Sequence, residues 1–251
     1  MKTALITGAT SGIGKSTAIE FANQGINLIL CGRREDRLND LKTQLKEKVE
    51  VHILSFDVRN QDEVFEKIQS LSPQFSKIDI LVNNAGNAHG LDPIQSGSIS
   101  DWDAMIDINV KGLLYVSKAI IPGMTERGGG HIINIGSIAG KEVYPNGNVY
   151  CASKHAVDAI NKGMLIDLNK YGIRVSAINP GLVATEFSNV RFKGDEERAE
   201  NVYKGFDPLK PEDIAEIIAF VVSRPYHVNI SDLVVLPTAQ ANSTIVNKNT
   251  L

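Results

Sequence analysis

Cysteine, aromatic side chains and long hydrophobic runs are all scarce in this sequence. Its 251 residues include two cysteines, Cys31 and Cys151, one tryptophan and 6% aromatic residues. One possible disulfide cannot brace a chain of this length, so the cysteine content favours a reducing compartment. No run approaches the roughly 18 apolar residues of a membrane span, and residues 4–6 are too short a run for a secretory signal. We therefore expect a cytoplasmic protein with no membrane association.

A marked excess of charge is also absent. Lys and Arg number 26 and Asp and Glu number 29, so the formal charge is −3. Nucleic-acid binding normally requires basic residues that neutralise phosphates, and this balance argues against such a partner. The five histidines show no metal-ligand spacing, so no metal site is expected. With 43% hydrophobic residues, the chain can bury a large core and does not match disordered proteins.

Short β-branched segments alternate with longer segments of helical period along the chain. Continuous apolar runs such as residues 131–135 suit strands that are covered on both faces, as in a parallel sheet. This alternation predicts a single-domain, Rossmann-type α/β fold, a doubly wound parallel sheet with helices on both faces. No linker interrupts it, so residues 1–251 are expected to form one domain. The expected strands are residues 3–7, 27–31, 49–54, 78–83, 131–135, 173–179 and 233–236.

Local signals mark the ends of several expected elements. Ser100 with Asp103 resembles a capping box at the start of a long helix near residues 101–124. Three glycines at 128–130 predict a turn before a strand, and Pro211 suits the first turn of a helix. The polar tail, residues 239–251, is expected to be ordered only by a partner subunit.

A glycine-rich segment follows the first expected strand and opens the first helix. Glycine permits close approach of the backbone to a ligand, and a helix N-terminus offers free N–H groups to a pyrophosphate. The spacing of Gly8, Gly12 and Gly14 differs from the G-x-G-x-x-G fingerprint but uses the same physics. The segment therefore predicts dinucleotide binding, and the alternative is a glycine-rich turn without a ligand.

The end of the second expected strand indicates which dinucleotide is bound. NAD enzymes usually have an acidic residue there for the ribose 2′-hydroxyl. This sequence has Arg33 and Arg34 instead, and guanidinium groups suit a 2′-phosphate. NADP is therefore favoured over NAD. Alternatively, the two arginines belong to a solvated helix start, neutralised by Glu35 and Asp36.

Tyr150 and Lys154 lie four residues apart on an expected helix over residues 149–170. This spacing puts the phenol and the ammonium on one face, where the cation is expected to lower the tyrosine pKa toward neutrality. Such a tyrosine can exchange a proton with a carbonyl or alcohol oxygen. Ser137 follows the fifth expected strand, where ligands bind in such sheets. Tyr and Lys four apart are common on surfaces, so the pair alone is a weak signal. Cys151 is expected to be buried filler.

Together with Asn83, Asn109 and Pro180-Gly181, these motifs resemble, in order and spacing, the classical short-chain dehydrogenase/reductase family. The resemblance covers essentially the whole chain. It implies an NADP-dependent oxidoreductase that acts on CH–OH groups. Members of the family are usually tetramers or dimers, and a homotetramer is expected here. Outside this pattern, Asn83 and Asn84 could cap a strand end and Asn109 could be a structural polar residue.

The resemblance implies roles for individual residues. The catalytic set is Asn109, Ser137, Tyr150 and Lys154; Tyr150 is the general acid/base, Ser137 holds the substrate oxygen, and Asn109 bends its helix and seats a relay water. Lys154 lowers the tyrosine pKa and binds the nicotinamide ribose. The cofactor set is Gly8, Ala9, Thr10, Ser11, Gly12, Ile13, Gly14, Arg33, Arg34, Asp57, Val58, Asn84, Ala85, Gly86, Tyr150, Lys154, Pro180, Gly181, Val183 and Thr185.

The C-terminal third resembles the NADP-dependent 3-hydroxy acid dehydrogenases, the subgroup that includes serine and allo-threonine dehydrogenases. Residues 184–208 look like their substrate lid, and Asp232-Leu233 is a further match. This resemblance implies a short 3-hydroxy acid or 3-oxo acid as substrate, such as serine, allo-threonine, 3-hydroxypropionate or malonic semialdehyde. We expect Ser137, Tyr150 and a lid cation, first Arg191 and second Lys193, to bind it.

Three alternatives stay open at this point. Arg191 could lie on the outside of a mobile lid. The enzyme could be a 3-oxoacyl or carbonyl reductase with a bulkier substrate, although Asn87 and His89 near the site favour a small polar one. The same fold could also serve a nucleotide-sensing regulator without catalysis.

Overall fold

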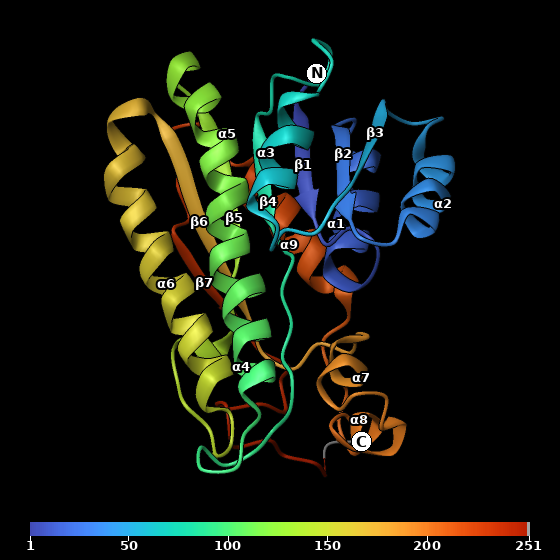
Figure 1. Cartoon of the computed structure of the whole chain (residues 1–251), viewed down its shortest axis with the longest axis vertical. Coiled ribbons are helices and arrows are strands. Elements are labelled where there is room, and N and C mark those ends of the chain that lie inside the picture. Colours follow the sequence, from blue (N-terminus) through green and yellow to red (C-terminus); the bar gives the residue numbers. More distant parts are fainter. Residues whose placement is uncertain (250–251) are drawn as a thin grey trace.

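A parallel sheet of seven strands forms the centre of the structure, a computed structural model in which residues 1–249 are described (Figure 1). The strand order is β3-β2-β1-β4-β5-β6-β7, and every neighbouring pair is parallel. The order reverses between β1 and β4, which creates the crevice where doubly wound sheets bind ligands. The strands are β1 (Thr3–Thr7), β2 (Asn27–Gly32), β3 (Val51–Ser55), β4 (Ile80–Asn83), β5 (Gly130–Ile135), β6 (Ile173–Pro180) and β7 (Asp232–Val235).

Helices cover both faces of the sheet. On one face, α1 (Gly12–Asn23), α2 (Glu35–Leu45) and α9 (Pro211–Ser223) bury side chains such as Phe21 against the strands. On the other face, α3 (Gln61–Gln69), α5 (Leu113–Arg127) and α6 (Asn148–Leu168) bury side chains such as Val116. The central strands are therefore apolar on both sides, which explains their continuous hydrophobic runs.

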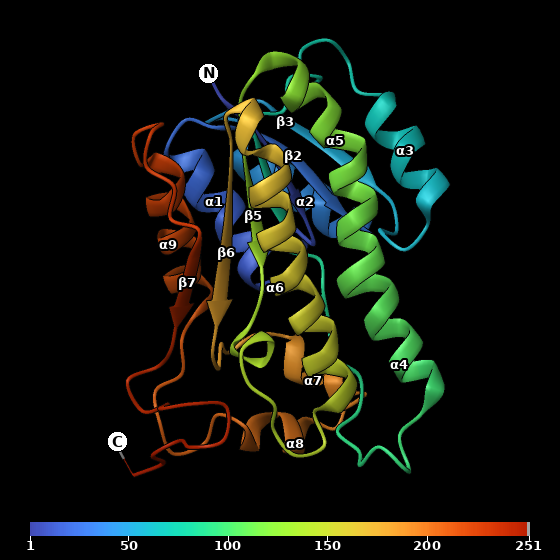
Figure 2. The ribbon, with the colours of Figure 1, turned by 90° about the vertical axis from the view of Figure 1, so that its left-hand side faces the viewer.

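Shorter helices complete the chain. α4 (Ile99–Ile106) continues through the π-helical turn η1 (Asp107–Gly112) into α5. The 3-10 turns η2 (Ile138–Gly140) and η3 (Asn169–Tyr171) precede and follow α6. α7 (Phe187–Arg191) and α8 (Glu196–Asn201) lie beyond the arrowheads of β6 and β7, so they cover the carboxyl end of the sheet (Figure 2).

The predicted fold class is confirmed, and all seven expected strands exist, with ends shifted by no more than two residues. Gly128 has a left-handed φ of 66° and ends α5, and Pro211 begins α9, as expected. The expected capping box is wrong: Ser98 is the N-cap of α4, and Ser100 lies inside the helix. The hydroxyls of these two serines contact each other at 2.8 Å instead.

The C-terminal tail makes contacts within its own chain. As far as residue 249 it folds back on its own chain, where the buried Gln240 accepts a hydrogen bond from the Leu182 amide at 2.9 Å. Lys248 reaches the carbonyl of Asn201 in α8 at 3.2 Å. Within the described residues, the tail therefore has intrachain partners, and a contribution of a partner subunit to its order stays a prediction; Thr250 and Leu251 lie outside the described residues.

Candidate active site

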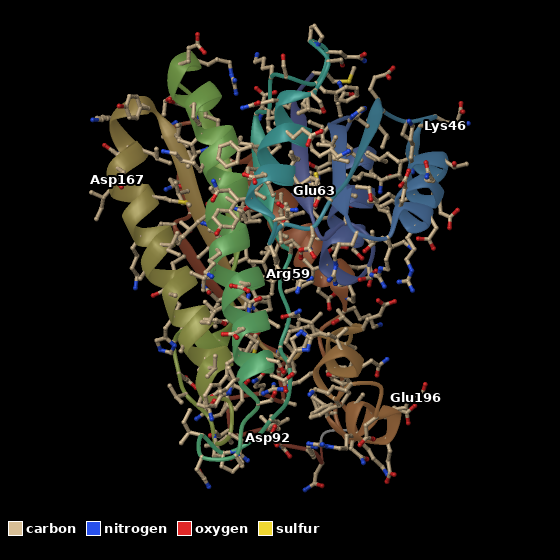
Figure 3. All side chains as sticks on the ribbon, in the orientation of Figure 1. Lys46, Arg59, Glu63, Asp92, Asp167 and Glu196 are labelled. Carbon is tan, nitrogen blue, oxygen red and sulfur yellow. The ribbon has the colours of Figure 1, made fainter. Side chains whose placement is uncertain are left out.

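Most of the predicted site residues gather at the carboxyl ends of strands β1 to β6. In a parallel sheet these ends share one edge, so segments far apart in the sequence meet there. The loop before α4 and the segment with α7 and α8 lie beyond this edge. Asp92 of that loop and Glu196 of α8 are found at the same end of the molecule (Figure 3).

The glycine turn between β1 and α1 is shaped by Asn84. Gly8 has a φ of 66°, which favours glycine, and the Asn84 amide donates to the carbonyls of Thr7 and Gly8 at 2.9 and 3.2 Å. A Cβ on Gly14 would lie 2.5 Å from the same amide nitrogen. Gly8 and Gly14 are therefore required by packing inside the protein, in addition to any ligand.

Asn83, the neighbouring asparagine, does not cap a strand end. Its amide donates to Ser117 of α5 and to Asn134 of β5, both at 2.9 Å. Asn134 in turn donates to Asn161 of α6 at 2.9 Å. This buried row of polar side chains joins two strands to two helices directly beneath the site.

The start of α1 and the adjacent arginines fit an anionic cofactor. The N-cap residue Ser11 makes no side-chain cap, so amides of the first turn can bind a phosphate. Arg34 donates to Thr10 and Ser11 across the turn, both at 2.9 Å. The Arg33 side chain is 59% exposed and only 3.7 Å from an Asp57 oxygen. The largely exposed Arg33 guanidinium, close to an uncapped helix N-terminus, suits a dinucleotide with a 2′-phosphate.

The solvated-helix alternative required Glu35 and Asp36 to neutralise Arg33 and Arg34. In the structure these arginines pair with other carboxylates, Arg33 with Asp57 and Arg34 with Glu186. Arg34 pairs with Glu186 at the start of α7 at 2.9 Å, and Arg37 pairs with the same carboxylate at 2.7 Å. Burial alone would raise the pKa of Glu186, but the hydrogen bonds from Arg37 and Arg34 lower it. Sequence reasoning missed Glu186, because its partner Arg34 lies 152 positions away.

The expected adenine contacts lie beside this region. Burial acts to raise the pKa of Asp57, yet hydrogen bonds from Arg59 outweigh it and the net pKa is lowered. The carboxylate is therefore held ionised by Arg59, 2.6 Å away. Val58 is buried against Gly112 of η1, where a Cβ would lie 2.7 Å from a Val58 methyl. The adenine role of both residues stays a prediction.

Tyr150, Ser137 and Lys154 meet where β5, η2 and α6 pack together. Both Tyr150 and Lys154 are buried, and Lys154 donates from Nζ to the carbonyl of Ile135 at 2.9 Å. Burial and the nearby Tyr144 raise the pKa of Tyr150 well above its usual range, although a hydrogen bond with Ser137 opposes this. Burial lowers the pKa of Lys154 to about 8.

These pKa directions differ from the sequence expectation. In the structure burial dominates for both groups, so the Tyr150 phenol keeps its proton at neutral pH. The Lys154 ammonium is directed to a backbone carbonyl, and the i, i+4 spacing alone does not make it lower the tyrosine pKa.

Asn109 lies in η1, which confirms that the helix is irregular at this residue. Its side-chain oxygen accepts from the Asn87 amide at 2.8 Å, and its nitrogen donates to the Asn87 carbonyl at 2.8 Å and to Ser153 at 3.0 Å. A Cβ on Gly86 would lie 3.0 Å from Asn109 and 3.7 Å from the Lys154 Nζ. The expected Asn84 to Gly86 segment therefore borders the catalytic set. The relay water stays a prediction.

The segment after β6 is held by the C-terminal tail. Gly181 donates to Val235 at 2.7 Å, and a Cβ there would lie 2.2 Å from the Gln240 side-chain oxygen. Thr185 faces Gly12 of the glycine turn, whose Cβ would lie 3.2 Å from the Thr185 methyl. Thr185 thus approaches the predicted cofactor turn. The contact of a nicotinamide carboxamide with Pro180, Gly181, Val183 and Thr185 stays a prediction.

Arg191 points inward from the lid segment. Its guanidinium carbon lies 5.6 Å from the centre of the Tyr150 ring and 5.4 Å from that of Tyr144. Nε donates to the Gly90 carbonyl at 3.2 Å, and Nη2 is buried without a hydrogen-bond partner among the described residues. The alternative of an outward-facing Arg191 is therefore wrong for this structure.

Lys193, the second candidate cation, is directed elsewhere. Its side chain is 61% exposed and pairs with Asp101 at 2.9 Å. Between the lid and α4 lies a narrow pocket of about 10 Å³, whose wall includes His89, Trp102, Met105, Tyr150 and Arg191. This volume has room for about one water molecule, so it does not by itself indicate the size of a ligand.

The described part of the chain contains neither a metal-binding cluster nor a membrane-spanning helix. Among residues 1–249, no group of three or more His, Cys, Asp or Glu side chains is arranged to hold a metal ion. None of the helices in this described part of the chain has the length and apolarity needed to cross a bilayer. Cys151 is buried, as expected for a packing residue.

Comparison with known proteins defines the class. A family model described as short chain dehydrogenase matches residues 2–196. The chain belongs to this family, and it is an oxidoreductase.

Three individual relatives narrow the comparison. An NADP-dependent 3-hydroxy acid dehydrogenase, YdfG, of Escherichia coli O6:H1 is 48% identical over 94% of this chain and 95% of its own. A sulfoacetaldehyde reductase of Chromohalobacter salexigens is 44% identical over 94% of each chain. The solved closed form of a serine dehydrogenase complexed with NADP+ is 45% identical, with a TM-score of 0.93 over 97% of this chain and 98% of that one.

Proposed function

We propose that this protein is an NADP-dependent dehydrogenase of short 3-hydroxy acids, which also reduces the corresponding 3-oxo acids or aldehydes. The cofactor is NADP, as in the 3-hydroxy acid dehydrogenase relative and in the serine dehydrogenase complex. The exposed Arg33 and the uncapped start of α1 provide the charge and the amides that its phosphates require. NADP supplies or accepts the hydride when bound.

The proposed proton transfer occurs at the Tyr150 hydroxyl. Because its pKa is raised, the phenol is protonated at neutral pH and can donate to a carbonyl oxygen during reduction. Ser137 Oγ accepts from the Ala139 amide at 3.1 Å, so its own hydrogen is available for Tyr150 or for the substrate oxygen. Asn109 fixes the backbone of Asn87 beside this pair. In the oxidative direction Tyr150 would accept the proton of the alcohol, which requires its phenolate form.

One observation carries the substrate proposal: the buried, unpartnered Nη2 of Arg191 beside the Tyr150 ring. A buried guanidinium nitrogen requires an acceptor, and a substrate carboxylate supplies a charged one. The sulfoacetaldehyde reductase relative acts, by its name, on a substrate with an anionic group, which is consistent with this reading.

The relatives do not favour the two open alternatives. All three are named for a dehydrogenase or reductase reaction, which argues against a non-catalytic regulator. No feature of the pocket favours a 3-oxoacyl thioester. Cytoplasmic location, assembly as a homotetramer and the division of the chain into one domain with a lid at residues 184–208 stay predictions.

The experiment is a comparison of NADPH oxidation rates with three substrates. Malonic semialdehyde, a 3-oxoacyl thioester and an aromatic ketone of similar reactivity are supplied to the purified protein at equal concentrations. We expect the semialdehyde to have the highest kcat/KM, at least tenfold above the others. Preference for the thioester or the ketone would refute the proposed substrate class.

A further inference from the structure

A chain of hydrogen bonds leads from the backbone of Ser137 to Asp232 on the edge strand. The Ser137 amide donates to the side-chain oxygen of Asn179 at 3.2 Å. The Asn179 amide nitrogen donates to Asp232 Oδ1 at 2.6 Å. A carboxylate can only accept, so Asp232 fixes which end of the Asn179 amide faces Ser137.

The packing around Asn179 leaves no room for a different arrangement. Asn179 is 1% exposed in β6. Its side-chain oxygen occupies the position beside Gly136, where a Cβ would lie only 2.0 Å away. Gly136 therefore has to be a glycine for Asn179 to reach the backbone of the next residue, Ser137.

Lys141 closes the chain into a ring. It directly follows η2, four positions after Ser137, and its Nζ pairs with Asp232 Oδ2 at 2.5 Å. The same Nζ pairs with Asp158 Oδ1 at 2.5 Å. Asp158 lies on α6, one turn after Lys154, so the ring is attached to the helix that holds Tyr150.

The turn itself is pressed against the same helix. A Cβ on Gly140 would lie 2.6 Å from the carbonyl oxygen of Lys154. The segment from Ser137 to Lys141 is thus held at its first residue by Asn179, in its middle by α6, and at its last residue by Asp158 and Asp232.

We propose that Asn179, Asp232 and Lys141 are positioning residues that hold the Ser137 hydroxyl at the right place against Tyr150. The inference rests on the proposed roles of Ser137 and Tyr150. It assigns a purpose to Asp232, which the sequence marked only as a point of resemblance. Displacement of a reacting group by about 1 Å can cost up to a hundredfold in rate, so a remote ring of this kind affects kcat.

The test compares Asp232→Ala and Asp232→Asn with the control Lys162→Ala. Lys162 pairs with the other oxygen of Asp158 at 2.6 Å, so it joins the network only at its outer end, and it is 62% exposed. We expect Asp232→Ala to lower kcat at least tenfold, with KM for substrate and cofactor within twofold. Asp232→Asn retains an acceptor for Asn179 and should keep at least one third of kcat. Lys162→Ala should match the wild type.

Two further measurements keep the proposal falsifiable. Lys141→Met leaves Asp232 in place and is expected to lower kcat threefold or more, which covers the case in which Asp232→Ala does not fold. Hydrogen-exchange mass spectrometry of the cofactor-free protein should show faster exchange in the peptide containing Ser137 for Asp232→Ala and not for Lys162→Ala.

The outcomes separate this inference from the proposed function. Wild-type kcat in Asp232→Ala and Lys141→Met, or an equal loss in Lys162→Ala, would overturn the positioning role. An equal loss in Asp232→Asn would also overturn it, because the acceptor for Asn179 would then not be what matters. If the wild type reduces none of the substrates, the proposed function fails, and the exchange experiment alone decides the positioning role.

Discussion

The most informative perturbation is the removal of the Arg191 charge. Arg191→Met keeps most of the side-chain length and abolishes the guanidinium. The backbone bond from the Gly90 amide to the Arg191 carbonyl, 2.9 Å, does not depend on the side chain and survives the change. The lid therefore keeps one attachment at this point, and the variant chiefly tests the charge.

The expected size of the effect follows from the contact that the guanidinium offers. A hydrogen bond to a charged group contributes about 1.5–3 kcal/mol, and 1.4 kcal/mol corresponds to tenfold in an equilibrium constant. The kcat/KM for a 3-hydroxy acid should therefore fall about 10- to 100-fold relative to that for an uncharged secondary alcohol of similar size. Loss of the Nε bond to Gly90 and of the ring contacts affects both substrates alike.

The assay measures NADP+ reduction with both substrates for the wild type, Arg191→Met and the control Lys193→Ala. The Lys193 ion pair with Asp101 has a largely exposed lysine, so its loss should cost no more than about 1 kcal/mol and should not distinguish the substrates. Equal losses on both substrates in Arg191→Met would refute carboxylate binding by this residue. So would a larger specificity change in Lys193→Ala.

Four further substitutions, one with a matched control, test separate parts of the protein. Tyr150→Phe should lower kcat by about 10²–10⁴-fold while NADPH binding, followed by fluorescence, is retained; unchanged kcat would exclude Tyr150 as the acid. Arg33→Ala should raise the Kd for NADP+ about tenfold and leave that for NAD+ unchanged, and equal effects on both would contradict 2′-phosphate recognition. Burial lowers the pKa of Lys154 from 10.5 to about 8, so the unfolded chain binds more protons in this interval and wild-type stability rises with pH across it. Lys154→Met lacks this pH dependence. The free energy of unfolding of the variant minus that of the wild type, measured by urea denaturation, should therefore fall by about 2–3 kcal/mol between pH 7 and 10. A difference that stays constant with pH would show that Lys154 is not desolvated. Gly14→Ala should lose about 1–3 kcal/mol of stability because its Cβ would lie 2.4 Å from the Gly8 carbonyl. The control Gly129→Ala has open space around the new Cβ and should change stability by less than about 0.5 kcal/mol. Similar melting temperatures for the two variants would contradict the packing argument.

The strands could be predicted from the sequence because each buried strand is a short apolar run, and a parallel sheet buries both faces. The irregular helix at Asn109 and the first turn of α9 at Pro211 followed from local signals or from the family pattern. The start of α4 was misjudged, because Ser98 and Ser100 both suit an N-cap and only the packed structure selects between them.

Long-range contacts could not be predicted. No local pattern indicates that Arg34 reaches Glu186, or that Gln240 accepts from Leu182, because these partners meet only once the sheet is assembled. The pKa of Tyr150 was misjudged for the same reason: the helical spacing shows a nearby lysine, while the burial that dominates depends on the lid and on α4. NADP as the cofactor, by contrast, was predicted correctly from local motifs, and the oxidoreductase class from the family resemblance that the motifs carry together.

The contact between Asn84 and the glycine turn has a consequence for how such motifs are interpreted. Since a side chain at Gly8 or Gly14 would collide with Asn84 or with the turn itself, the two glycines are needed whether or not a nucleotide ever binds. A descendant of this chain that lost its cofactor would still lose stability on replacing either of them. The glycine spacing is therefore a marker of ancestry and architecture, whereas Arg33, Tyr150 and Arg191 are the positions where a change of chemistry would be recorded.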